Sequence, residues 1–140
     1  MNTLKNGRNY LIKNNMNLVV IQDDLVVFES NKMGIIPMFD FYNSEIEGDV
    51  YIIDKFIGSG AARLLLKSKA NIKGIFTFVI SKDALKLIES KEINVEYERI
   101  VTKILNKRKD DLCPIEKISL GNDEFSDFYS NLEKFIAKMK

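Results

Sequence analysis

Hydrophobic residues recur along this chain at two spacings, one typical of helices and the other typical of strands. The helical spacing of three to four residues is found over residues 4–12, 57–69 and 125–139. Between these stretches lie runs rich in β-branched and aromatic residues, at 17–21, 25–29, 50–53, 74–80 and 94–99. The pattern therefore predicts helices that alternate with strands.

Local signals indicate where several of these elements begin and end. A short polar segment at 22–24 separates two strand-like runs, as the turn of a β-hairpin does. The run 74–80 is almost continuously apolar, which indicates a central strand covered on both faces. Ser81 follows it directly, in the position of a helix N-cap, and Pro114 opens a short helix later in the chain. The stretch 34–42 fits either a helix or an extended segment.

The order of these elements predicts one α/β domain over residues 1–140. A helix and a hairpin, followed by alternating helices and strands, give a mixed sheet of about five strands with helices on both faces. No repeat, low-complexity tract or linker rich in proline and glycine divides the chain. We therefore expect a three-layer α-β-α sandwich.

Composition excludes several classes of protein and of site. The apolar fraction of 46%, the charged fraction of 29% and the net charge of +1 describe an ordinary globular domain. Because positive and negative charges are nearly balanced, we expect no nucleic-acid partner. No apolar run is long enough to span a membrane. Cys113 is the only cysteine and no secretory signal is visible, so we expect a cytoplasmic location. Because histidine is absent as well, the chain cannot assemble a histidine- or cysteine-cluster metal site, and we expect neither metal nor cofactor.

Several segments, spread over most of the chain, carry a resemblance to a known family. They are Val26–Ser30, Gly34–Pro37, Ile53–Ala62, Val79–Leu85, Val95–Glu98 and Leu112–Lys117. Together with the order of elements, they resemble an uncharacterised prokaryotic family of unknown function that is assigned to the cytidine-deaminase-like fold. The resemblance implies this fold and no known reaction.

The deaminase reaction itself can be compared with the residues of this chain. Zinc deaminases hold their metal with a histidine or cysteine at one helix start and with a cysteine pair at the next. In this chain the corresponding positions are Asp54 with Lys55, and Ser81–Ala84. Neither position offers a nitrogen or sulfur ligand. We therefore expect a deaminase-like fold that binds no zinc and deaminates neither cytidine nor adenosine.

Polar and small residues at the first of these helix starts are candidates for a site, because open α/β sheets build their ligand crevices there. Asp54 could act as a base or hydroxyl acceptor and Lys55 could hold an anion or a carbonyl, unless the pair only caps the helix. Gly58, Ser59 and Gly60 could cradle a phosphate on helix-start amides. Small residues at this spacing more often let a helix pack closely on a sheet.

The second helix start and the late cysteine add further candidates. Ser81, with Lys82 beside it, could be a nucleophile, although a plain N-cap is the commoner role. Cys113 precedes a helix and follows the basic run Lys107–Lys109, which would favour its thiolate; the alternative is a buried, inert cysteine. The predicted catalytic residues are Asp54, Lys55, Ser81 and Cys113, and the predicted ligand-binding residues are Gly58, Ser59, Gly60 and Lys82.

Two hypotheses of function remain open. The first is a metal-independent small-molecule site, binding or catalytic and suited to a nucleotide-like ligand, where the helix starts converge on one edge of the sheet. The second is a non-catalytic regulatory or protein-interaction module that retains the fold. An open cleft with converging polar groups favours the first, and an edge closed by side chains favours the second. A homo-oligomer is compatible with both, and the residues do not decide whether any reaction exists.

Overall fold

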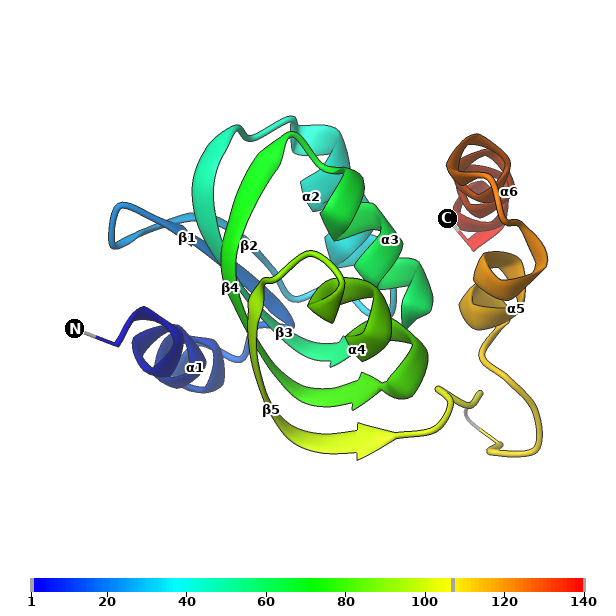
Figure 1. Cartoon of the computed structure of the whole chain (residues 1–140), viewed down its shortest axis with the longest axis horizontal. Coiled ribbons are helices and arrows are strands. Elements are labelled where there is room, and N and C mark those ends of the chain that lie inside the picture. The colour runs from blue at the N-terminus through cyan, green and yellow to red at the C-terminus, as the bar shows by residue number, and fades with distance from the viewer. Residues whose placement is uncertain (1, 107, 140) are drawn as a thin grey trace.

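A mixed five-stranded sheet forms the centre of the computed structural model, which describes residues 2–106 and 108–139 (Figure 1). Its strands are β1 (Leu18–Gln22), β2 (Leu25–Ser30), β3 (Gly48–Ile57), β4 (Ala70–Ser81) and β5 (Asn94–Val101). They lie in the order β2-β1-β3-β4-β5. β1 is antiparallel to both of its neighbours, whereas β3, β4 and β5 are parallel. The predicted mixed sheet is confirmed.

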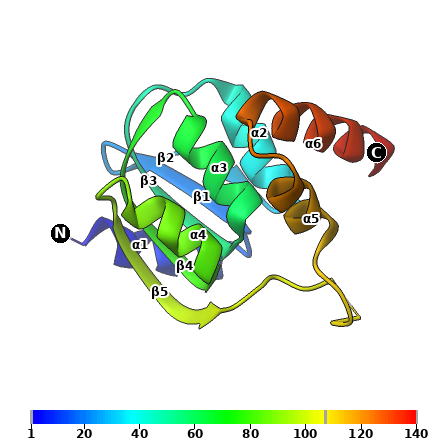
Figure 2. The ribbon, with the colours of Figure 1, turned by 45° about the vertical axis from the view of Figure 1, so that its right-hand side comes forward.

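Helices cover both faces of this sheet, as the order of elements predicts. They are α1 (Thr3–Lys13), α2 (Ile36–Ser44), α3 (Ser59–Lys67), α4 (Lys82–Glu89), α5 (Pro114–Gly121) and α6 (Phe125–Met139). α1 lies on one face and α2, α3 and α4 lie on the other, while α5 and α6 pack outside α2 and α3 (Figure 1, Figure 2). Among the described residues, no helix is both long and apolar enough to cross a membrane.

Neighbouring residues of the central strands are buried on opposite faces of the sheet. Ile52 of β3 and Ile75 of β4 are fully buried in the cluster beneath α2, α3 and α4. Ile53 and Phe76, which follow them, pack in the cluster that α1 covers. A strand with two covered faces has no polar side, and this explains the continuous apolar run of β4.

The third strand is longer than the sequence pattern predicts. β3 extends to Ile57, which still pairs with β4, and only Gly58 separates it from α3. The helix predicted at 57–69 therefore begins later than expected. Asp54 and Lys55 lie inside β3, so their placement at a helix start is wrong.

Two other segments refine the prediction. The ambiguous stretch 34–42 is mostly helical, because Pro37 stands in the first turn of α2, where its missing N–H leaves no hydrogen bond unmade. β5 is the edge strand next to β4 and is exposed along most of its length. The strand β5 therefore has no clear division into a buried face and a solvent-exposed face.

Candidate functional site

The carboxyl ends of β3 and β4 place two helix starts side by side. The strands are parallel and in register, with Ile57 opposite Ile80, so Gly58 and Ser81 lie at the same edge of the sheet. The helices α3 and α4 that begin there pack against each other. Such an edge is where open α/β sheets usually bind ligands, so it is the candidate site.

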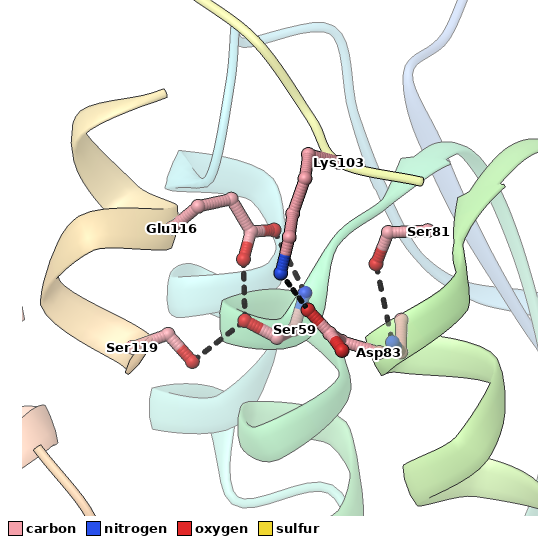
Figure 3. A network of polar contacts seen from close by, with 7 residues as sticks. Ser59, Ser81, Asp83, Lys103, Glu116 and Ser119 are labelled. Atoms are coloured by element: carbon pink, nitrogen blue, oxygen red, sulfur yellow. Dashed lines mark hydrogen bonds and ion pairs between the residues drawn. The ribbon is translucent and has the colours of Figure 1, made fainter. Parts of the chain in front are cut away.

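A carboxylate from α5 occupies the start of α3 (Figure 3). The Ser59 N–H donates to Glu116 Oε1 at 2.8 Å, and the Ser59 hydroxyl donates to Glu116 Oε2. Ser119, one turn further along α5, places its Oγ 2.7 Å from Ser59 Oγ. Free amides and the positive end of the dipole make a helix start favourable for an anion. Glu116 therefore takes the position that an anionic ligand of α3 would take.

The backbone at Gly58 leaves room for this carboxylate. A Cβ on Gly58 would overlap Glu116 Oε1, and the Glu116 residue is only 5% exposed. Burial raises the pKa of the Glu116 carboxyl, hydrogen bonds from Ser59 lower it, the charge of Asp83 raises it and that of Lys103 lowers it. The contact is thus a buried polar one, with charged groups of both signs nearby.

Side chains of the protein also engage the start of α4 (Figure 3). Ser81 Oγ accepts a hydrogen bond from the Ala84 N–H at 3.1 Å, which confirms the predicted N-cap. Asp83, in the first turn, forms an ion pair with Lys103 at 2.9 Å. The two charged side chains are 40% and 42% exposed, so this pair contributes little to stability.

Asp54 lies deeper in the sheet than either helix start. It pairs with Leu18 of β1 and Thr77 of β4, three residues before the end of β3. Ser81 is four residues beyond Thr77, so Asp54 and Ser81 are separated by about 13 Å along the strands, at about 3.3 Å per residue. The two residues approach the same edge, but they are too far apart to touch.

The environment of Asp54 disfavours its charge. The residue is 9% exposed, and burial raises its pKa from 3.8 to about 8, although backbone hydrogen bonds from Lys55 and Phe56 lower it. No ion pair reaches Asp54 within the described part of the chain. At neutral pH most of this carboxyl is protonated, so it can donate a proton or a hydrogen bond.

Known proteins share this architecture. A family model described as "Domain of unknown function (DUF1893)" matches residues 6–136. The chain belongs to this family. The crystal structure of TM1506, a DUF1893 family protein from Thermotoga maritima, is similar to it with a TM-score of 0.82 and 28% sequence identity, over 94% of this chain and 89% of that one. No curated protein matches the chain.

The small residues of this DUF1893 chain allow α5 and α6 to approach α3 closely. Gly58 faces Glu116, as described above. A Cβ on Gly60 would come within 2.8 Å of the Ile115 side chain and 3.7 Å of the Phe128 ring. These contacts favour helix packing over a phosphate cradle as the reason for the glycines around Ser59.

The other predicted site residues are dispersed around the edge. Lys55 is half-buried in β3 and Lys82 is exposed on α4. Cys113 is half-buried and is the N-cap residue of α5, but its side chain makes no capping hydrogen bond. Lys107, part of the basic run before it, lies outside the described residues. These groups do not gather around one point.

Sequence patterns did not single out Glu116, Ser119 or Lys103. Glu116 belongs to the Leu112–Lys117 segment of the resemblance, but an acidic residue in the first turn is common in any helix. Its special position comes from a contact with Ser59, which is 57 residues earlier in the chain. No local signal could have revealed that contact.

Two cavities lie at the opposite edge of the sheet. One of about 400 Å³ is lined mainly by Ala70–Lys73 and Lys91–Ile93, and one of about 440 Å³ is lined by Asn2–Leu4, Tyr51 and Asn94, among others. Neither includes a residue of the candidate site.

Within residues 2–106 and 108–139, no three His, Cys, Asp or Glu side chains are grouped so that they could hold a metal ion.

Proposed function

We propose that this DUF1893 chain is a non-catalytic regulatory or protein-interaction module of the cytoplasm, built on a cytidine-deaminase-like fold. The observation that carries the proposal is the Glu116 carboxylate, which fills the start of α3 from within the chain. The opening helix and hairpin, followed by parallel strands that alternate with helices, support the fold assignment. The net charge of +1 gives no reason to expect a nucleic-acid partner.

The polar groups that a ligand would need at this edge are engaged within the protein. The N–H and hydroxyl of Ser59 are bonded to Glu116, the hydroxyl of Ser81 caps its own helix, and Asp83 is paired with Lys103. A ligand at the start of α3 would have to displace the Glu116 carboxylate. Leaving a buried carboxylate without partners costs free energy, so the closed edge favours a module without a reaction.

An exposed apolar side chain beside the same edge supports a protein partner. Phe56, near the end of β3, is 57% exposed. A partner that covered it would remove a large apolar side chain from water, which stabilises a complex.

Thermal unfolding with candidate ligands tests the proposal. The purified chain is heated with nucleosides, nucleotides and small carboxylic acids, and a ligand that binds only the folded state would raise the Tm. We expect no compound to do so. A compound that raises the Tm of the wild type but not that of Ser81→Ala would overturn the proposal. Ser130→Ala, at an exposed serine of α6, is the matched control and would retain the shift.

The buried Asp54 carboxyl favours one other candidate, a metal-independent small-molecule site. Strongly perturbed pKa values are concentrated at functional sites, and the pKa of Asp54 is raised to about 8. Here Asp54 would donate a proton or hydrogen bond to a nucleotide-like ligand. This candidate expects a rise in Tm that Asp54→Ala removes, because alanine can donate neither a proton nor a hydrogen bond. Asp49→Ala, at an exposed position of the same strand, would keep the rise.

A further inference from the structure

Polar side chains hold the helix α5 against the rest of the protein. Its buried residues are Glu116 and Ser119, and both contact Ser59 of α3. Its isoleucines, Ile115 and Ile118, are only partly buried. The next helix, α6, differs because its buried residues are all apolar.

This difference makes the two helices unequally stable. If α6 left the protein, its apolar side chains would enter water, which the hydrophobic effect opposes. If α5 left, Glu116 and Ser119 would exchange hydrogen bonds with Ser59 for hydrogen bonds with water, and the partly buried Ile115 and Ile118 would become more exposed, so the cost in free energy is smaller than that for α6. Local opening is therefore easier at α5 than at α6.

The two ends of α5 are held with different strength. At its C-terminal end, the Arg63 guanidinium of α3 donates to three carbonyl oxygens at the junction with α6, at 2.6, 2.7 and 3.0 Å. At its N-terminal end, the Cys113 N–H donates to the Ile104 carbonyl at 3.0 Å, and Leu105 pairs with Leu112 at an isolated bridge. Arg63 thus ties the C-terminal end directly to α3, whereas these bonds join the N-terminal end to neighbouring residues of the preceding segment, which contacts α4 through the exposed pair of Lys103 and Asp83.

We propose that α5 is a latch, which opens about the Arg63 anchor while the sheet and α6 stay folded, and so uncovers Gly58 and Ser59 at the start of α3. The latch needs no ligand, so it does not depend on which proposed function is correct. If α5 opens in this way, the closed edge of the sheet opens reversibly under native conditions.

The strength of the latch changes with the protonation of Glu116. The polar and charged groups around this carboxyl are Ser59 of α3, Asp83 of α4, Lys103 of the segment after β5, and Ser119 of α5 itself. Burial raises the pKa of Glu116 when α5 is docked. Because the docked state binds this proton more tightly than the open state, docking is strongest at low pH and weakens as the pH rises through the raised value.

Native-state hydrogen exchange of the full chain, followed by NMR, tests the latch. The informative amides are that of Ser59, which donates to Glu116, and that of Lys117, which donates to the Cys113 carbonyl within α5. After correction for intrinsic exchange rates, we expect the protection factors of these two amides to be at least about tenfold below those of the amides of β4. Exchange of Ser59 and Lys117 with the same opening free energy as β4 would overturn the proposal, because α5 would then open only on global unfolding. This measurement on the wild type shows whether α5 opens separately from the sheet, even if a variant fails to fold.

Variants at Glu116 test the cause of the opening. Glu116→Gln keeps an acceptor oxygen but cannot ionise, so we expect protection of Ser59 to be independent of pH, whereas it falls with rising pH in the wild type. Glu89→Gln, at an exposed glutamate of α4, is the matched control and should keep the wild-type pH dependence. Glu116→Ala should lower the protection of Ser59 at least about tenfold with β4 unchanged. An equal loss of protection throughout the sheet would show that α5 is not a separate unit.

Discussion

Replacing Asp54 by asparagine should stabilise the protein at neutral pH. Asp54 is 9% exposed, it forms no ion pair in the described part of the chain, and its pKa is raised from 3.8 to about 8 by burial. Asparagine has nearly the same shape and keeps an oxygen for the backbone N–H groups of Lys55 and Phe56. It replaces the O–H of the protonated carboxyl by an amide NH2 and removes the ability to ionise.

The magnitude follows from the two pKa values of Asp54. Above pH 3.8 the unfolded carboxyl loses its proton while the folded one keeps it, so folding is disfavoured by about 1.36 kcal/mol for each further pH unit. Near pH 7 this cost amounts to about 4 kcal/mol, and it stops growing above about pH 8, where the folded carboxyl ionises too. Asp54→Asn should therefore raise the free energy of unfolding by up to about 4 kcal/mol near pH 7 and by almost nothing near pH 4.

Urea unfolding over a series of pH values measures this difference. Wild-type stability should fall as the pH rises from about 4 to about 8, and the fall should be much smaller in Asp54→Asn. Asp49→Asn, at an exposed position of the same strand, should follow the wild-type curve. If the curves of wild type and Asp54→Asn run parallel, Asp54 ionises normally in the folded protein and the reasoning is wrong.

Other substitutions test the neighbouring contacts. Gly58→Ala should expel the Glu116 carboxylate and lower the free energy of unfolding by about 1–3 kcal/mol, as measured by denaturant titration. Gly121→Ala is the control and should not lower the free energy of unfolding, because a Cβ there meets nothing within 4 Å. Lys103→Ala should change the free energy of unfolding by less than about 1 kcal/mol in the same titration, because its pair with Asp83 is about 40% exposed on both sides. Cys113→Ser should add an N-cap hydrogen bond that the thiol does not make and raise the free energy of unfolding by about 0.5–1 kcal/mol, with Cys113→Ala giving no such gain.

Local chemistry in the sequence was sufficient to place several elements of the fold. Ser81 follows a strand and caps the next helix, and Pro114 opens α5 at its first position, because both effects depend on the backbone of a few neighbouring residues. The continuous apolar run of β4 likewise revealed a strand that is buried on both faces. In each case the cause lies within a few residues of its effect.

The boundary of β3 and the contact at its end required the tertiary structure. Ile57 has the apolar character of the helix that follows, yet its pairing with Ile80 keeps it in the sheet, and Asp54 and Lys55 are therefore strand residues. Glu116 has the appearance of an ordinary first-turn acid until the fold brings it to Ser59. The candidate edge could thus be predicted from the order of strands and helices, but not the side chain that closes it.

The coupling between Ser59 and Glu116 tests most directly whether the protein closes this edge with its own carboxylate. A double-mutant cycle of Ser59→Ala and Glu116→Ala, measured by urea unfolding, isolates the interaction of the two side chains from their other contacts, because each substitution removes it. Because a hydrogen bond from the Ser59 hydroxyl reaches a buried carboxylate, we expect a coupling free energy of about 1–3 kcal/mol. Additivity of the two substitutions within about 0.3 kcal/mol would contradict the account, since Glu116 would then not occupy the start of α3 in solution.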